Sequence, residues 1–309
     1  MKTNLKTKTA FRNRLHPATS AELQAWKDTP LRSGDVPYVR AINTIGTSEA
    51  EVELRMESGG RWRLCLRGTD TIAVFSHPAI FYAADDYYSG NYVPKGERIP
   101  NGIIEAERYA NWKCSYTYVF DTSADRSFYD MQKKLEAYVT RNPDFNPGKL
   151  PRRDYQSGGR VEYTRRFRVK APMFLRLRDG ETKPAPPDDL HPWVAEADAD
   201  AKYYYANPVR PGVFALEQGR IRDIQHCQPA ELTRGDVVLL MFTLTFIVGP
   251  EDWTPHYVPV DIVRVASGAP VLWNASDFAV PVVDNRVRPA FVDGEEVEGA
   301  YLVSLGLGA

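Results

Sequence analysis

The stretch Val237-Val-Leu-Leu-Met-Phe-Thr-Leu-Thr-Phe-Ile-Val248 is the longest apolar run of the chain. It is too short to span a membrane as a helix, which needs about 20 apolar residues. Valine, threonine and aromatic side chains fit the pleated surface of a sheet better than a helix. The run therefore predicts a strand in the core of a β-rich fold.

Other segments of the chain carry the same strand signal. Val52, Leu54 and Met56 alternate with polar residues, as do the apolar residues 62, 64 and 66 beyond Ser58-Gly59-Gly60. Period-two alternation on both sides of a Gly-Gly turn indicates a β-hairpin. Further strands are predicted at 112–120, 160–170, 173–178, 203–206, 212–216 and 256–265, with weaker ones near Val280 and Leu302.

One main helix is predicted near 125–141. Thr122 and Ser123 suit the N-cap, and apolar side chains then recur at helical spacing from Phe128 to Val139. The apolar stripe is wide enough to pack on a sheet. The expected fold class is thus mainly β, a β-rich α+β fold with antiparallel sheets or a partly open barrel.

Changes in charge and proline content along the chain suggest four regions. Residues 1–30 form a basic arm with a short helix, 31–180 a β-rich subdomain, 181–200 an acidic, proline-rich linker or long loop, and 201–309 a second β subdomain. Within the first subdomain, 76–104 is expected to be a surface loop rich in Tyr, Gly and Pro. A single large β domain with a long crossing loop is the alternative.

The charge and the cysteine content of the chain bear on its ligands and on its cellular compartment. The formal net charge is −1, so only local clustering of charge can recruit a polyanion. Cys65, Cys114 and Cys227 are odd in number and far apart, the pattern of reduced thiols in an intracellular protein of the nucleus or cytoplasm. We expect no role at a membrane.

No catalytic or metal-binding motif stands out. GxSxG, HExxH, the phosphate-binding P-loop and GxGxxG are all absent, and no two histidines have a metal-ligand spacing. We therefore expect no cofactor and favour a non-enzymatic binding protein. An enzyme built from sequence-distant residues remains an alternative, because geometry rather than order defines a catalytic site.

The segment 149–178 is the chemically biased part of the chain. It holds ten basic residues against only Asp154 and Glu162, with Tyr and Phe interleaved. Cations displace counterions from phosphates and aromatic faces accept unstacked bases, so this mixture is typical of single-stranded DNA or RNA binding. The candidate site residues are Arg152, Arg153, Arg160, Tyr163, Arg165, Arg166, Phe167, Arg168 and Lys170, with Tyr163 and Phe167 stacking on bases.

Within a strand, Arg166, Arg168 and Lys170 would project from one face and the intervening residues from the other. The competing interpretation is a solvated hairpin whose arginines pair with the acidic stretch 179–200. Such internal neutralisation would leave nothing for a nucleic acid to bind.

A local resemblance adds to the binding hypothesis. Leu232-Thr-Arg-Gly235-Asp236-Val-Val, followed by an alternating apolar strand, resembles a strand opening in OB-fold modules, many of which bind single-stranded nucleic acid. The resemblance covers residues 231–265. It implies a β-barrel with a binding groove across its face and carries over no base-contacting residues.

A different class of function is also open. The Tyr-rich segment 81–92, the loops bearing Trp193 and Trp253, and the basic arm would suit a self-assembling or protein-interaction module with no nucleic-acid role.

Overall fold

A computed structural model describes residues 17–101, 103, 105–123, 125–153, 166–178 and 180–267 of the chain. The helices are α1 (Pro17–Trp26), α2 (Tyr38–Thr44), α3 (Ser127–Val139) and α4 (Pro192–Asp200), with the short 3-10 helix η2 (Ile224–His226). The strands are β1 (Val36–Pro37), β2 (Val52–Ser58), β3 (Arg61–Leu66), β4 (Phe75–Ala84), β5 (Ser115–Asp121), β6 (Arg166–Pro172), β7 (Phe174–Arg176), β8 (Tyr204–Ala206), β9 (Gly212–Glu217), β10 (Arg220–Asp223), β11 (Val237–Val248) and β12 (Trp253–Ala266). The predicted β-rich class is confirmed.

Ten of these strands form one sheet, in the order β10-β9-β12-β11-β4-β5-β6, with β1 on β4 and the β2–β3 hairpin on β11. The apolar run 237–248 is β11, which pairs with β12, β4 and β3 and so lies at the centre of the sheet. Most pairs are antiparallel, while β1–β4 and β12–β9 are parallel. Between the described strands, the path ends at β10 and β6 without closing a barrel.

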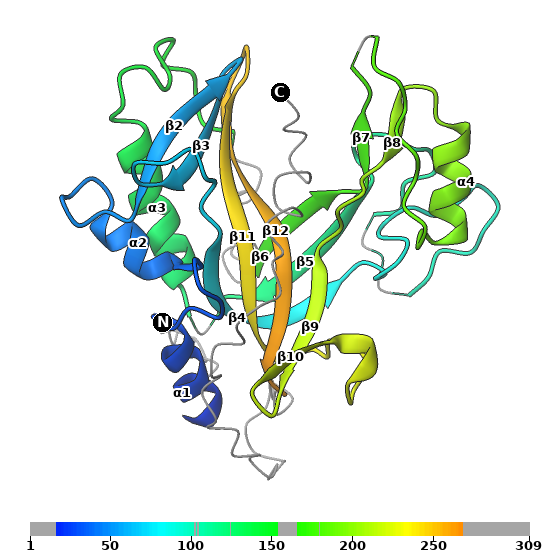
Figure 1. Cartoon of the computed structure of the whole chain (residues 1–309), viewed down its shortest axis with the longest axis horizontal. Coiled ribbons are helices and arrows are strands. Elements are labelled where there is room, and N and C mark those ends of the chain that lie inside the picture. Colours follow the sequence, from blue (N-terminus) through cyan, green and yellow to red (C-terminus); the bar gives the residue numbers. More distant parts are fainter. Residues whose placement is uncertain are drawn as a thin grey trace, which may run out of the picture.

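The sheet is strongly curled (Figure 1), and buried aromatic side chains from several of its strands pack in one core cluster. Phe167 on β6 comes within 5.1 Å of Tyr257 on β12, measured between ring centroids, although three strands, β11, β4 and β5, separate β6 from β12 along the sheet order. Phe128 of α3 contacts both rings, with its centroid 4.0 Å from that of Phe167 and 5.5 Å from that of Tyr257. Helix α3 therefore packs an aromatic ring against both β6 and β12.

The outer face of the central strands carries a second core. Leu23 and Trp26 of α1 pack in one cluster with Leu239 and Met241 of β11 and Val263 of β12. Burial on both faces explains why β11 is apolar throughout instead of alternating.

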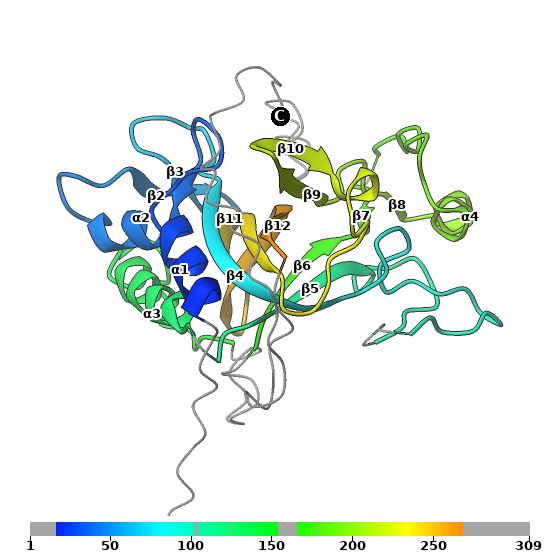
Figure 2. The same ribbon diagram turned by 90° about the horizontal axis from the view of Figure 1, so that it is seen from below.

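Different elements pack at the two ends of the sheet. Helices α1, α2 and α3 gather at one end with the β2–β3 hairpin, whereas β7, β8 and α4 form a small lobe at the other (Figures 1 and 2). The two-stranded β7–β8 sheet joins β6 directly, because only Met173 separates β6 from β7.

Several sequence predictions can now be compared with the structure. The hairpin at 52–66 and the helix near 125–141 are confirmed as β2–β3 and α3. The expected surface loop at 76–104 is wrong at its start, where β4 is a buried strand of the main sheet. Its buried stretch carries apolar side chains towards both faces, so the alternation that marks a half-buried strand is missing.

The single sheet crosses the predicted subdomain boundary. Strands β9 to β12, from the region 201–309, pair within the same sheet as β1 to β6 from the region 31–180. The stretch 181–200 includes α4, whose Val194 and Ala197 are buried in the same core cluster as β11. The predicted arm and the strands near Val280 and Leu302 lie largely or wholly outside the described residues.

Nowhere among the described residues is there a helix long and apolar enough to cross a membrane.

A buried histidine links β4 to α3. His77 is only 2% exposed, its ring meets Phe128 edge-on at 4.7 Å, and its Nε2 lies 3.3 Å from the Ser127 hydroxyl. Burial lowers the pKa of His77 to about 3, because the charged imidazolium would lose its hydration among these rings. His77 is therefore neutral in the folded protein at physiological pH.

This burial predicts a loss of stability in mild acid. Below about pH 6.5 the unfolded chain binds a proton on His77 and the folded chain does not, so the free energy of unfolding falls as the pH falls. Between about pH 7.5 and 5.5 the wild type should lose about 1.4 kcal/mol more than His77→Gln in urea titrations. Equal losses in the two proteins would contradict a neutral, buried His77.

The position of Phe167 makes a second prediction. Its ring is fully buried between α3 and β12, so Phe167→Ala should lower the free energy of unfolding by about 3–5 kcal/mol, measured in denaturant. Tyr109→Ala removes a ring that is 68% exposed and should change stability by less than about 0.5 kcal/mol. A similar small effect of Phe167→Ala would mean that β6 does not close the aromatic core.

Candidate nucleic-acid interface

Strand β6 displays the basic residues as the alternation predicts. Arg166, Arg168 and Lys170 are exposed on one face, while Phe167 and Val169 are buried on the other. The predicted site residues Arg160, Tyr163 and Arg165 lie outside the described residues.

Phe167 is not a base-stacking residue in this structure. Its exposed fraction is 0%, and its neighbours are Phe128, Tyr129 and Tyr257. The expectation that Phe167 stacks on a base is therefore corrected, because the same alternation that exposes the arginines turns this ring into the core.

Arg152 and Arg153 hold the chain between α3 and the turn that joins β11 to β12. Arg152 forms a 2.8 Å ion pair with Glu136 of α3, and Arg153 a 2.7 Å pair with Asp252. Backbone hydrogen bonds join residues 151 and 153 to Trp253. Since each guanidinium already faces a carboxylate, we leave both arginines out of the interface.

The acidic stretch 179–200 has partners away from β6. In the part of the chain that the structure describes, its ion pairs are Glu181 with Arg178, Asp189 with Arg210, and Asp198 with Lys183. Only Arg178 belongs to the basic segment 149–178. None of these three ion pairs involves Arg166, Arg168 or Lys170.

A tyrosine brings a further arginine to this face. The guanidinium carbons of Arg166 and Arg234 lie 3.8 and 4.3 Å from the centroid of the Tyr82 ring. The ring attracts each guanidinium through its quadrupole and so keeps the two cations close to each other.

Backbone bonds bring Tyr82 and Arg234 together. The Phe81 N–H donates to the Asp236 carbonyl, and the Gly235 N–H donates to the Phe81 carbonyl. Gly235 has a φ of +103°, a conformation that glycine adopts without strain. The turn singled out by its OB-fold resemblance therefore presents Arg234 to β4, and a register shift between Phe81 and Ala83 marks Tyr82 as the bulge residue.

Helix α3 anchors the first residue of the row. The Tyr129 hydroxyl donates to the Arg166 carbonyl at 2.7 Å. Burial raises the pKa of Tyr129 to about 12, so the hydroxyl remains a donor at neutral pH. The backbone of β6 is thus held by this side-chain hydrogen bond from α3 and by its pairing with β5.

The resulting surface is suited to binding anions. Arg166, Arg168, Lys170 and Arg234 are exposed, and their charges add to a positive local potential. The described residues contain no group of His, Cys, Asp or Glu that could hold a metal ion. Burial raises the pKa of the Cys114 thiol to about 11, which makes it a poor nucleophile.

Comparison with solved structures finds a loose likeness to a single-stranded DNA-binding protein from bacteriophage Enc34. Its C-terminally truncated form aligns with a TM-score of 0.31 and 7% identity, covering 73% of this chain and 99% of that one. The complex with single-stranded DNA gives a TM-score of 0.30 and 7% identity over 71% and 98% of the two chains. No family model and no curated protein matches the sequence.

Sequence reasoning missed two members of this surface. The sequence predicts a loop at Tyr82 and a turn at Arg234, and neither pattern places these residues beside β6. They are about 150 positions apart, and no local pattern links them. The only signal available was the Gly235-Asp236 turn, which predicts a bend but not what the bend contacts.

The stacked arrangement can be tested by double-mutant cycles. Pairing Tyr82→Leu with Arg166→Gln, and then with Arg234→Gln, should show coupling energies of about 0.5–1 kcal/mol each in urea unfolding. Tyr82→Phe keeps the ring and should keep both couplings. As a control, Tyr82→Leu with Arg61→Gln on the distant hairpin should show no coupling, and couplings near zero for all pairs would contradict the stack.

Proposed function

We propose that this chain is a binding protein for single-stranded nucleic acid, held along the outer face of β6. The observation that carries the proposal is the exposed row Arg166, Arg168 and Lys170, extended by Arg234 across the Tyr82 ring.

The row has the geometry for a repeating anion. Side chains two residues apart on a strand are about 6.6 Å apart, so the row spans about 13 Å. A polynucleotide presents phosphates at regular intervals along its backbone, whereas a small anion would engage only one or two of these cations. Binding would release counterions from several phosphates at once.

Because the cationic row lies on a β-sheet, we expect it to bind single-stranded nucleic acid and not a duplex. Reading a duplex requires a helix or ribbon that enters a groove, while a sheet face lies alongside an extended chain. The predicted residues Arg160, Tyr163 and Arg165 directly precede β6 in the sequence, and we keep them in the proposal as an extension of the row.

The proposal competes with self-assembly through the sheet edge. Among the described strands β6 pairs only with β5, which makes it an edge strand. Cationic side chains on an edge discourage pairing with a second copy, so the same residues argue against edge-to-edge assembly. Protection of the edge would by itself account for the cationic row, without any ligand. A binding experiment distinguishes protection of the edge from nucleic-acid binding.

The test compares two charge-matched triple variants. Arg166→Gln, Arg168→Gln and Lys170→Gln together should weaken binding of a labelled single-stranded oligonucleotide at least tenfold in fluorescence anisotropy. Because three phosphate contacts are lost, the slope of log affinity against log salt should become shallower by about 2. Arg40→Gln, Arg61→Gln and Arg67→Gln change the net charge equally on other surfaces and should retain the wild-type slope.

The proposal would fail on either of two results. One is that wild-type protein shows no salt-sensitive binding at low ionic strength. The other is that both triple variants weaken binding equally, which would mean that only the net charge matters. Light scattering on the same variants would show whether removing the edge charges instead induces assembly.

A further inference from the structure

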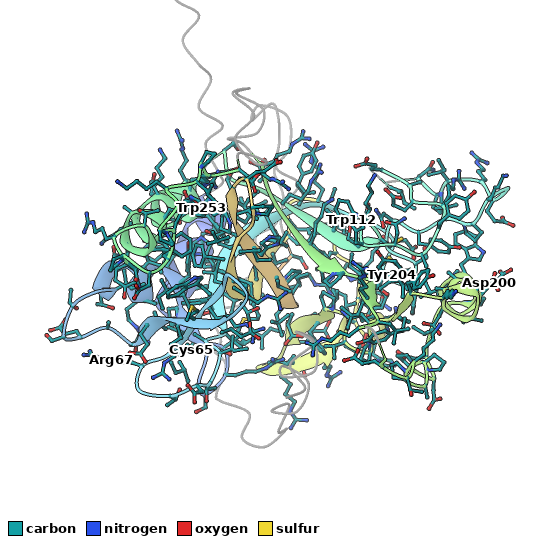
Figure 3. All side chains as sticks on the ribbon, turned by 90° about the horizontal axis from the view of Figure 1, so that it is seen from above. Cys65, Arg67, Trp112, Asp200, Tyr204 and Trp253 are labelled. Carbon is teal, nitrogen blue, oxygen red and sulfur yellow. The ribbon has the colours of Figure 1, made fainter. Side chains whose placement is uncertain are left out.

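Exposed aromatic side chains gather at one end of the molecule. Within the described residues, the exposed aromatic rings are Tyr88, Tyr109, Trp112 and Tyr203; the first three lie between β4 and β5, and Tyr203 lies just before β8. Figure 3 shows Trp112 between the main sheet and the lobe, on the opposite side from Trp253 and Cys65. Trp112 is the most exposed of the four, at 73%.

The turn that carries Trp112 is held in place by its own polar groups. The Asn111 side chain accepts a 2.6 Å hydrogen bond from the Lys113 N–H and donates to the Tyr109 carbonyl at 2.8 Å. From outside the turn, the Asn91 side chain donates to the Lys113 carbonyl and accepts from the Ser115 N–H. Trp112 is thus presented by an ordered turn, which lowers the entropy cost of binding.

The strand register places this turn beside the end of the cationic row. Thr117 of β5 pairs with Lys170, and Ser115 pairs with Pro172 at the end of β6. Trp112 precedes Ser115 by three residues, so its turn lies beyond the Lys170 end of the row and not beyond the Arg166 end.

We propose that Trp112 stacks on a base of the single strand whose phosphates lie on β6, with Lys113 on an adjacent phosphate. This inference rests on the proposed function and names the group that recognises bases. Among the described residues of the row there is no ring open to a base, because Phe167 is buried and Tyr82 already contacts two guanidinium groups.

The charges beside the ring fit this occupant. The Lys113 ammonium lies 5.7 Å from the centroid of the Trp112 ring, so a cation stands next to the stacking surface. A nucleotide pairs a flat base with an anionic phosphate in the same way. Glu196 and Asp200 mark α4 as the acidic side of the lobe, and Figure 3 shows the labelled Asp200 at its far end. The strand therefore passes over residues 107–115 and not over α4.

The experiment uses three probes of equal length: single-stranded oligo-dT, a strand with abasic sites in place of every base, and a duplex. Stacking requires a base, so wild-type protein should bind oligo-dT about tenfold more tightly than the abasic strand. Trp112→Ala should abolish that preference while leaving the affinity for the abasic strand and its salt dependence unchanged. Tyr203→Ala is the matched control, because it also removes an exposed ring with a lysine beside it, Lys202 at 5.2 Å, and it should behave as wild type.

The outcomes separate this inference from the function on which it rests. If wild type binds oligo-dT and Trp112→Ala keeps the base preference, or if Tyr203→Ala loses it equally, Trp112 is not the stacking residue although the function stands. If wild type binds none of the three probes, both proposals are overturned. Tighter binding of the duplex would overturn the single-strand geometry of both, and unchanged unfolding curves for the two variants would exclude misfolding as the cause of any loss.

Discussion

The contact between Phe128 of α3 and Phe167 of β6, at 4.0 Å between ring centroids, is the constraint on which the arrangement depends. It draws the last strand of the sheet inward until Phe167 also meets Tyr257 of β12. Once Phe167 and Val169 point inward, the period of a strand forces Arg166, Arg168 and Lys170 outward. The cationic row is thus a consequence of core packing, and its orientation cannot change without exposing the aromatic core.

Secondary structure could be predicted from the sequence wherever one face of an element is buried and the other is exposed to solvent. The hairpin at 52–66, helix α3 and the alternation of β6 all show that asymmetry in their residue patterns. Strand β4 does not, because its buried part has apolar residues on both faces, and Pro78 counts against a central strand. The proline is accommodated because β4 pairs with β1 at residues 75–76 and with β5 from residue 80, so on that side Pro78 has no partner strand among the described residues.

From the sequence, the candidate site could be predicted only for residues that lie on the same β-strand. The cations of β6 follow from composition and period, but Tyr82 and Arg234 come from other strands and turns, and only the sheet register unites them. Trp112 shows a related difficulty. The sequence predicts a strand from residue 112, yet β5 begins at Ser115, and Trp112 lies in the Asn111 turn with its indole exposed to solvent. Sequence spacing does not say where a strand begins.

The arginines of this fold are held in two different ways. Arg152 and Arg153 face carboxylates, which cancel their charge and fix one segment against another. At Tyr82 the partner of Arg166 is an aromatic ring, which orients a guanidinium but carries no net charge to cancel it. Holding Arg166 and Arg234 on the same ring costs Coulomb repulsion, which an approaching polyanion would relieve. A fold that needed these arginines only for stability would gain more from a carboxylate at the position of Tyr82.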